Sequence, residues 1–276
     1  LFPATLCKNM TQPITTMISD AAAPSPEELG RFLSQYGAWL LGSGSTCIRV
    51  EKNINRMALT FGMAVEITIM PRHLQVAVCR CGSDRLVTHL SAVRQTPTSF
   101  NIITRLSELS WAVADGRINF ATATQQFNQI ISSDRQNKAA VLLMVALANA
   151  SFCRLFGGDA AAMAIVGIAT LCGYYIKTVL IERGIDIRAV FIICALVSSI
   201  LGATDILFPH GSTPYIAVAT SVLYLVPGIP FLNSFSDLLH RHYICAFSRF
   251  ADAVILTGCL SAGLCGGMLL MKIGMF

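Results

Sequence analysis

The chain has 276 residues, of which 54% are hydrophobic and 13% are charged, and its mean hydropathy is +0.62. Soluble globular domains carry about 25% charged residues, so this composition excludes a purely soluble enzyme, a disordered acidic protein and a collagen-like fibre. The net charge of +5 is not gathered into a basic patch with interleaved aromatic residues, which argues against nucleic-acid binding.

Residues 1–26 show no periodic pattern and no continuous apolar stretch, so we expect a flexible tail and no signal peptide. Residues 27–135 are expected to form a cytoplasmic α+β domain. Apolar spacing and turn residues predict its elements in chain order. They are helices over 27–42 and 48–62, strands over 64–70, 74–80 and 85–90, and helices over 99–115 and 120–131.

Residues 136–276 are the predicted membrane domain. Residues 139–276 hold 7 Lys/Arg and 6 Asp/Glu, against 13 and 9 in residues 1–138, and long uncharged runs separate them. Such runs have about the length that a bilayer requires. We expect membrane helices at about 136–156, 158–180, 186–206, 212–240 and 250–273. The expected fold is therefore an α+β domain followed by an all-α bundle of about five membrane helices.

The basic residues predict the orientation of these helices, because Lys and Arg are enriched in cytoplasmic loops. If the amino-terminal domain is cytoplasmic, seven basic residues flank the helices on that side and two on the other, which places the carboxyl terminus outside. The seven are Arg135, Lys138, Lys177, Arg183, Arg188, Arg241 and Arg249, and the two are Arg154 and Lys272.

Two sequence features suggest a ligand site but have simpler explanations. The loop Gly42-Ser-Gly-Ser-Thr46 lacks the Gly-Lys-Ser/Thr of a phosphate-binding loop and joins two predicted helices, so a helix C-cap followed by an N-cap explains it. Ten cysteines are scattered through the chain, and only Cys79 and Cys81 lie close together. We therefore predict no metal site and no cofactor.

The fourth apolar run contains a predicted break at Pro227–Pro230. A proline has no N–H group to donate to the preceding helical turn, and hydrocarbon cannot satisfy the carbonyl that is freed. Transporters commonly build mid-membrane binding sites from such broken helices, and the positive amino end of the following half-helix favours a carboxylate. We therefore predict that Ser221, Pro227 and Gly228 line a substrate cavity.

Beyond the break, Asn233, Asp237 and Arg241 are spaced at i, i+4 and i+8, which places them on one helix face. An amide, an acid and a guanidinium together could bind a polar carboxylate, and Asp237 could carry a coupling proton. The alternative is a helix that ends at the cytoplasmic surface, with Asp237 and Arg241 forming a solvated ion pair. Asp159 and Asp252 are further candidates for ion or proton coupling, although both lie near predicted helix ends where water has access.

Three stretches resemble the threonine/serine exporter family. They are Gly42-Ser-Gly-Ser-Thr-Cys-Ile-Arg-Val-Glu51, Phe156-Gly-Gly-Asp159, and Leu225-Val-Pro-Gly228 with Asn233, Asp237 and Arg249. The chain is similar to the amino-terminal half of that family, which occurs alone as a YjjP-type subunit working with a smaller YjjB-type membrane subunit in succinate export. Through this resemblance Gly157, Gly158 and Arg249 become candidate structural or gating residues.

The resemblance implies a subunit of a bacterial inner-membrane exporter for a small carboxylate, either a succinate-like dicarboxylate or threonine and serine. It implies no enzyme activity. Fused family members carry a second membrane half after the point where this sequence stops, so we expect a YjjB-like subunit or a homo-oligomer to supply it. A membrane-anchored enzyme and a ligand-sensing regulatory subunit remain alternatives. Against the enzyme, residues 27–135 show no nucleophile–base spacing.

Overall fold

The computed structural model describes residues 24–80, 85–94, 96–132, 137–207 and 211–272, without the side chains of Asp205 and Leu207. The expected tail over 1–26 lies outside these residues except for its last three. The chain forms two compact units. Unit 1 comprises Leu1–Asp134 and Ile229–Phe250, and unit 2 comprises Arg135–Gly228 and Ala251–Phe276.

Unit 1 begins with the helices α2 (Pro26–Gly42) and α3 (Cys47–Thr60). A capping box starts α2: the Glu28 N–H donates to Ser25 Oγ over 3.2 Å, and the Glu28 carboxylate accepts from the Ser25 N–H over 2.9 Å. The Ser25 N–H and hydroxyl both donate to the Glu28 carboxylate and lower its pKa. The N-cap residue of α3, Thr46, makes no such side-chain bond. The amino end of α3 therefore needs a partner from elsewhere in the fold.

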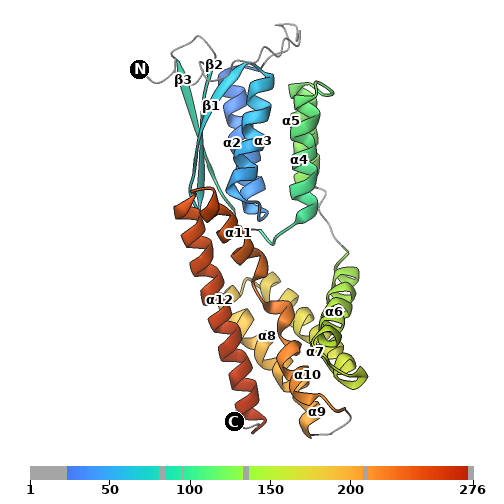
Figure 1. Ribbon diagram of the computed structural model, residues 1–276. Coiled ribbons are helices and arrows are strands. Elements are labelled where there is room, and N and C mark those ends of the chain that lie inside the picture. The colour runs from blue at the N-terminus through green and yellow to red at the C-terminus, as the bar shows by residue number, and fades with distance from the viewer. Residues whose placement is uncertain (1–23, 81–84, 95, 133–136, 208–210, 273–276) are drawn as a thin grey trace. The chain divides into compact units, whose positions relative to one another are not determined.

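A three-stranded antiparallel sheet follows, in the order β1 (Met63–Ile69), β2 (His73–Arg80) and β3 (Leu86–Ala92). Its register places Val65 opposite Val78 and Val76 opposite His89. Leu74, Val76 and Val78 alternate along β2 and are all fully buried. They face the helices, since α2 packs on β2 and β3 while α3 packs on β1. Figure 1 shows this sheet beside α2 and α3.

A further helical layer covers α2 and α3. It consists of α4 (Phe100–Ala114) and α5 (Phe120–Ser132), with α4 packed on α3 (Figure 1). The Phe32 ring meets the rings of Phe120 and Phe127 edge-on, at centroid distances of 5.5 and 5.6 Å. The Tyr36 hydroxyl donates to the Leu106 carbonyl over 2.7 Å. One continuous apolar core thus runs through the sheet and both helical layers.

Unit 1 is completed by a segment from far down the chain. This segment holds α11 (Gly228–Leu239), apart from its first residue, and the first turns of α12 (Tyr243–Leu270). Ser234 Oγ donates to the Ala246 carbonyl over 2.8 Å and so ties the two helices together. Cys245 of α12 is buried in the same core as α2, α3 and the sheet. The amino-terminal elements therefore pack as one unit with residues about 190 positions later in the sequence.

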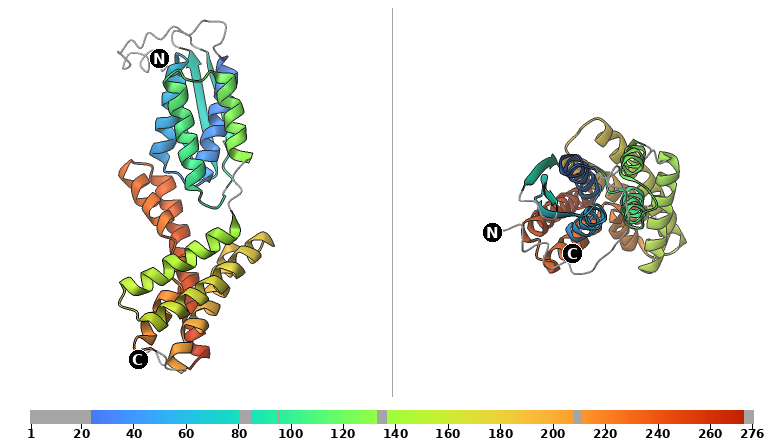
Figure 2. Two further views of the ribbon diagram at one scale, coloured as in Figure 1. Left: turned by 90° about the vertical axis from the view of Figure 1, so that its right-hand side faces the viewer. Right: turned by 90° about the horizontal axis from the view of Figure 1, so that it is seen from above.

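Unit 2 is helical throughout its described residues. The helices α6, α7 and α8 pack in sequence, and α10 packs against all three. The left view of Figure 2 shows α6 and α7 side by side. The elements are α6 (Lys138–Leu155), α7 (Ala160–Glu182), α8 (Ile187–Gly202), α9 (Thr204–Leu207), α10 (Pro214–Ser221), the 3₁₀ turn η2 (Leu223–Leu225) and the remainder of α12.

Glycines bring α12 close to α8 within unit 2. A Cβ atom at Gly263 would overlap the Ile192 carbonyl oxygen, and one at Gly267 would overlap Ser199 Oγ. Small residues of this kind let two membrane helices approach until their backbones touch. The small residues of α12 thus serve packing within the chain at these two positions.

Three described helices, α6, α7 and α12, are long and apolar enough to cross a membrane. A fourth crossing is obtained if Pro214–Leu225 and Gly228–Leu239 are taken together as one broken span. The apolar helix α8 is shorter, at 16 residues. The chain is therefore built as a multi-pass membrane protein.

The expected fold class, an α+β domain followed by an all-α bundle of about five membrane helices, is wrong. The described residues are predominantly helical, with a single small sheet of three strands. The first half forms no separate α+β domain, because its unit also contains Ile229–Phe250. Length and composition support three crossings, or four with the broken span, instead of five. Periodicity identified the local elements but could not show which distant segment packs against them.

Candidate functional site

The Gly-Ser-Gly-Ser loop between α2 and α3 uses its own N–H groups to end α2. Ser43, Gly44 and Ser45 donate to carbonyls in the last turns of that helix, over 2.9, 3.1 and 3.2 Å. Gly44 has a φ of +93°, which a residue with a side chain rarely adopts. Because these donors are used within the chain, the loop is a helix cap and offers no N–H cradle for a phosphate, as the sequence indicated.

The first two carbonyls of the same loop are bound by the segment that leads into α4. The Gly42 carbonyl accepts from the N–H of Thr96 over 3.2 Å and from its hydroxyl over 3.1 Å. The Ser43 carbonyl accepts from the Ser99 N–H over 3.1 Å. This side of the loop is thereby fixed within the amino-terminal sequence.

The next two carbonyls are bound by side chains from α11 and α12. Asn233 Nδ2 donates to the Gly44 carbonyl over 2.7 Å. Arg249 Nη2 donates to the Ser45 carbonyl, also over 2.7 Å. All four carbonyls from Gly42 to Ser45 therefore have partners, and two of these partners come from the distant segment of unit 1.

Asp237 lies at the centre of this arrangement and is fully buried. Its Oδ1 accepts from the Cys47 N–H over 2.8 Å and so caps α3 from another part of the chain. Its Oδ2 lies 2.9 Å from Arg249 Nη1. The two atoms are not aligned as a hydrogen bond, so this contact is an ion pair. We call the group formed by Gly44, Ser45, Cys47, Asn233, Asp237 and Arg249 the Asp237 cluster.

Thiol and imidazole groups lie beside the Asp237 cluster without forming a metal-binding site. A hydrogen bond with the Cys245 side chain, together with burial, raises the pKa of the Cys47 thiol. His242 Nε2 lies 3.4 Å from Glu51 Oε1 and pairs with it when protonated. Within the described residues, no group of three or more His, Cys, Asp and Glu side chains is placed to hold a metal ion.

Arg241 does not join Asn233 and Asp237 on one helix face. α11 ends at Leu239, and Arg241 has a left-handed φ of +66° and is exposed. The His242 N–H donates to the Asp237 carbonyl over 2.9 Å, which closes the helix end. The guanidinium that meets Asp237 belongs to Arg249 instead, a residue that entered the prediction through the family resemblance.

Ser221, Pro227 and Gly228 lie around the break that precedes α11. Ser221 is buried, and its hydroxyl donates to the Val218 carbonyl over 2.7 Å. Pro227 is buried and Gly228 is exposed. The Gly228 N–H donates to the Val226 carbonyl over 2.8 Å, a tight turn in place of the helical pattern. The chain is thus interrupted where the two prolines predicted a break.

Of the remaining predicted residues, Gly157, Gly158 and Asp159 lie between two membrane helices, whereas Asp252 lies within α12 and not at its end as expected. Asp159 caps α7: its Oδ1 accepts from the Ala162 N–H over 2.8 Å, and its Oδ2 accepts from the N–H and hydroxyl of Ser212. Gly157 has a φ of +90°, and a Cβ at Gly158 would overlap the sulfur of Cys153. Asp252 is exposed on α12. Asp159 and the two glycines therefore shape the turn between α6 and α7.

Unit 2 also contains polar contacts that link its helices away from these predicted residues. Asn149 Nδ2 donates to Thr170 Oγ1 over 2.6 Å and to the Thr220 carbonyl over 3.2 Å, which links α6, α7 and α10. Ser198 Oγ and the Tyr224 hydroxyl lie 2.9 Å apart and link α8 to η2. Asn149 stands out in an apolar run, whereas single hydroxyl residues in such runs give no signal.

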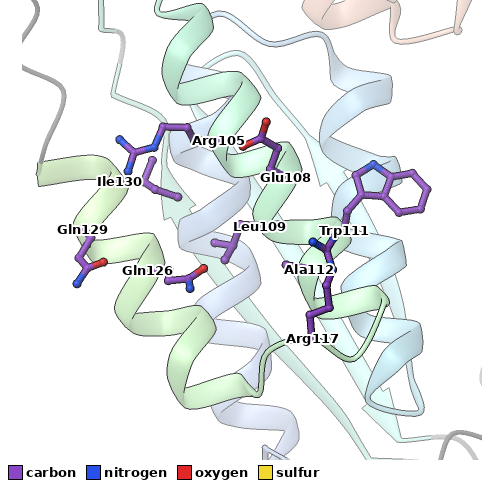
Figure 3. Close-up of a pocket in the computed structure, with 9 residues that line it drawn as sticks. All are labelled: Arg105, Glu108, Leu109, Trp111, Ala112, Arg117, Gln126, Gln129 and Ile130. Carbon is purple, nitrogen blue, oxygen red and sulfur yellow. The ribbon is translucent and has the colours of Figure 1, made fainter.

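Unit 1 has a cavity of about 580 Å³ between α4 and α5, away from every predicted site residue. Figure 3 shows Arg105, Arg117, Gln126 and Gln129 among the side chains around it. Arg117 is paired with Asp115 over 2.8 Å. The lining is thus polar and combines basic groups with the carboxylate of Glu108.

Comparison with known proteins agrees with this membrane architecture. A family model described as a putative threonine/serine exporter matches residues 31–271. The chain is 27% identical over 229 residues to the probable succinate transporter subunit YjjP of Klebsiella aerogenes, covering 82% of this chain and 88% of the relative. It is 26% identical to the protein of the same name from Escherichia coli, with the same coverage. No solved structure matches the chain.

The family match spans elements of both units, from α2 to the last turn of α12 and beyond. The descriptions of the family and of the relatives are those of exporters and transporter subunits, not of enzymes. This protein is a membrane transporter subunit, and the chain belongs to the threonine/serine exporter family.

Proposed function

We propose that the protein is a subunit of an inner-membrane exporter for a small carboxylate, either a succinate-like dicarboxylate or threonine and serine. The family description supports the amino acids, and the names of the two relatives support succinate. Both kinds of substrate carry a carboxylate. The observation that carries the proposal is the buried pair of Asp237 and Arg249. A guanidinium that pairs with the carboxylate of Asp237 is also suited to pair with the carboxylate of a substrate.

In this proposal the Asp237 cluster acts as a clasp, meaning an ion pair that is closed while Asp237 is ionised and opens when Asp237 is protonated. While Asp237 is ionised, it balances Arg249 and caps α3, and its full burial keeps substrate away. Protonation of Asp237 removes the negative charge, so that Arg249 becomes available to a substrate carboxylate. Asn233, one turn earlier on α11, then offers an amide to the same ligand. When the substrate leaves, Asp237 gives its proton to water on the side of release, which restores the ion pair and couples proton movement to transport.

The break at Pro227–Gly228 directly precedes α11, and we propose that it lines the substrate cavity with Ser221. Free backbone groups at such a break require a polar lining, which a substrate path provides. We propose that the amino-terminal part of unit 1 lies in the cytoplasm and the carboxyl terminus outside. The basic residues support this placement, as does the continuation of α12 from unit 1 into unit 2 as an apolar helix.

We further propose that the transporter is completed by a small membrane subunit of the YjjB type or by a second copy of this chain. The word subunit in the names of both relatives supports an assembly. Cross-linking in the native membrane distinguishes the two, since a homo-oligomer gives multiples of 29.7 kDa.

The test is efflux of labelled succinate, threonine and serine from vesicles that contain the full-length protein with its co-purified partner. We expect export of at least one substrate, and a loss of at least about tenfold in Asn233→Ala, the size of one lost hydrogen bond to a charged group. The double variant Asp237→Asn/Arg249→Gln removes both charges together, so that no unbalanced charge destabilises the fold. It should remain folded and lose export.

The matched control is Asp115→Asn, which removes an exposed acid of unit 1 outside the Asp237 cluster and should export at the wild-type rate. Normal export by the folded double variant would remove the clasp from the proposal. Failure of the wild-type protein to export any of the three substrates would overturn the proposed substrate class.

A second candidate function is ligand sensing, and the cavity between α4 and α5 favours it (Figure 3). If this cavity binds a regulatory carboxylate, succinate should raise the melting temperature of the wild-type protein, and Gln126→Ala with Arg117→Gln should abolish that shift. Export by the same variant should then keep its maximal rate but lose its dependence on cytoplasmic succinate. An unchanged melting shift in the variant would exclude this site.

A further inference from the structure

Lys177 is a cationic side chain within the membrane helix α7 and has no acidic partner among the described residues. Its Nζ lies 5.6 Å from the ring centroid of Tyr174 and 5.4 Å from that of Phe191. The side chain is partly buried, and α7 continues past it to Glu182. Glu182 itself is paired with Lys138, at the start of α6. Glu182, the acid at the end of this helix, is therefore paired with another lysine and not with Lys177.

An unpaired ammonium group in a membrane helix is costly, and such groups usually mark a pathway for substrates or ions. Two aromatic rings offset part of that cost by cation–π attraction. They supply no hydrogen-bond acceptor, however, and an ammonium group has three N–H donors. The Lys177 site thus offers positive charge and free donors to an anion.

The Tyr174 ring, which contacts this cation, also contacts a second tyrosine, whose hydroxyl is paired with a serine. The ring of Tyr174 packs edge-on against that of Tyr224, with centroids 6.3 Å apart, and the Tyr224 hydroxyl lies 2.9 Å from Ser198 Oγ. Gly173 makes room for this pair, since a Cβ there would overlap both hydroxyl oxygens. Tyr224 belongs to η2, the turn just before the break at Pro227. Through the Tyr174 ring, a chain of contacts therefore runs from the Lys177 ammonium group on α7 to the hydroxyls of Tyr224 on η2 and Ser198 on α8.

We propose that Lys177, Tyr224 and Ser198 form a carboxylate-binding subsite in unit 2. The ammonium group pairs with the carboxylate, and the hydroxyls donate to its oxygens, with one hydroxyl–hydroxyl bond exchanged for bonds to the ligand. Tyr174 and Phe191 shield the pair from lipid. The subsite rests on the proposed function in taking a transported small carboxylate as its ligand. It differs from the Asp237 cluster, which lies wholly in unit 1.

The experiment is equilibrium binding of labelled succinate to the full-length protein in nanodiscs of phosphatidylcholine, a lipid without net charge. Lys177→Gln and Lys177→Met should both weaken binding by at least about tenfold, since each removes a charged hydrogen-bond donor. Methionine keeps the packing on the two rings. Tyr224→Phe keeps its ring and should weaken binding by about threefold or more. Unlabelled succinamide, the neutral diamide, should not compete.

Lys138→Gln is the matched control, because it removes an exposed lysine that already has an acidic partner. It should bind succinate like the wild type. Repeating the measurement with phosphatidylglycerol in the nanodiscs separates a substrate subsite from a site for anionic lipid. A lysine that serves only the lipid would leave succinate binding equal in Lys177→Gln and wild type while losing stabilisation by phosphatidylglycerol, and that result overturns the subsite.

The outcomes also separate this subsite from the proposed function. The subsite alone is overturned if two results occur together. The first is export by the wild type in vesicles, and the second is binding of succinate, threonine and serine by both Lys177 variants within about twofold of wild type. If the wild-type protein binds and exports none of the three compounds, the subsite and the proposed substrate class fall together. Folding of each variant is checked by its melting temperature without ligand.

Discussion

The two units use different polar contacts for the same purpose of holding distant segments together. In unit 1, α11 and α12 are joined to the loop before α3 by a buried ion pair and charged hydrogen bonds around Asp237. In unit 2, the contacts between Asn149 and Thr170 and between Ser198 and Tyr224 are neutral. Its charged contacts, such as the Lys138–Glu182 pair, lie at exposed helix ends. Close glycine packing, as at Gly263, supplements the neutral contacts.

The difference follows from the surroundings of each unit. An acid–guanidinium pair can be buried when backbone groups form hydrogen bonds with its other polar atoms. The Cys47 N–H and the Ser45 carbonyl do so here. In a lipid-embedded bundle, burying a charge costs more free energy. Amides and hydroxyls form weaker contacts between helices but bury no charge. Unit 1 should therefore respond strongly to the loss of one charge, and unit 2 should respond more to changes in volume.

The largest effect is expected from Asp237→Asn, which leaves Arg249 buried without its counter-charge. We expect a loss of about 3–5 kcal/mol in the stability of unit 1. Tryptophan fluorescence during thermal unfolding measures it selectively, because Trp39 and Trp111 are the two tryptophans of the chain and both lie in unit 1. The double variant with Arg249→Gln should recover at least half of the loss. A single variant as stable as wild type would contradict the charge-based account of unit 1.

A smaller effect is expected in unit 2 from Gly173→Ala. The new Cβ would overlap the Tyr224 hydroxyl and Ser198 Oγ, and such overpacking costs about 1–3 kcal/mol. The helical circular dichroism signal should melt earlier while the tryptophan transition of unit 1 stays in place. Gly258→Ala is the control, because nothing lies within 4 Å of a Cβ at that position. Equal melting of the two alanine variants would argue against tight packing at η2.

The smallest effect concerns the exposed cap of α7. The Ala162 and Ser212 N–H groups lower the pKa of Asp159 below its ordinary value of 3.8. A carboxylate with a lowered pKa in the folded state stabilises above the unfolded pKa and loses this effect as the pH falls through the folded pKa. The melting-temperature advantage of wild type over Asp159→Asn should thus be constant at neutral pH and shrink below about pH 4. An advantage independent of pH would mean that the carboxylate charge contributes nothing.

The local elements of unit 1 were largely predictable from the sequence. Ser25 and Glu28 mark the start of α2, and alternating apolar residues such as Val76 and Val78 mark β2. These signals are local, because each depends on residues within one or two turns or along one strand. The return of α11 to the loop at Gly44 leaves no such trace, since its hydrogen bonds join residues almost 190 positions apart. This is why the expected two-part fold was wrong.

The candidate site was predictable in part for the same reason. Helical spacing correctly places Asn233 and Asp237 one turn apart on α11, but it cannot show that the helix ends before Arg241, where neither Gly nor Asn marks the left-handed turn. Arg249 lies on the following helix, and periodicity does not link it to Asp237. It was found only because the sequence resembles a family.

The loop from Gly42 to Ser45 is held through its backbone, since all four of its carbonyls accept hydrogen bonds. The hydroxyl of Ser43, in contrast, is buried without a hydrogen-bond partner. Other small residues in place of the loop serines would therefore keep these backbone hydrogen bonds. The glycine at position 44 lacks this freedom because of its positive φ. The contacts between this loop and the distant segment of unit 1 are therefore determined by the side chains of Asn233, Asp237 and Arg249 and not by those of the loop.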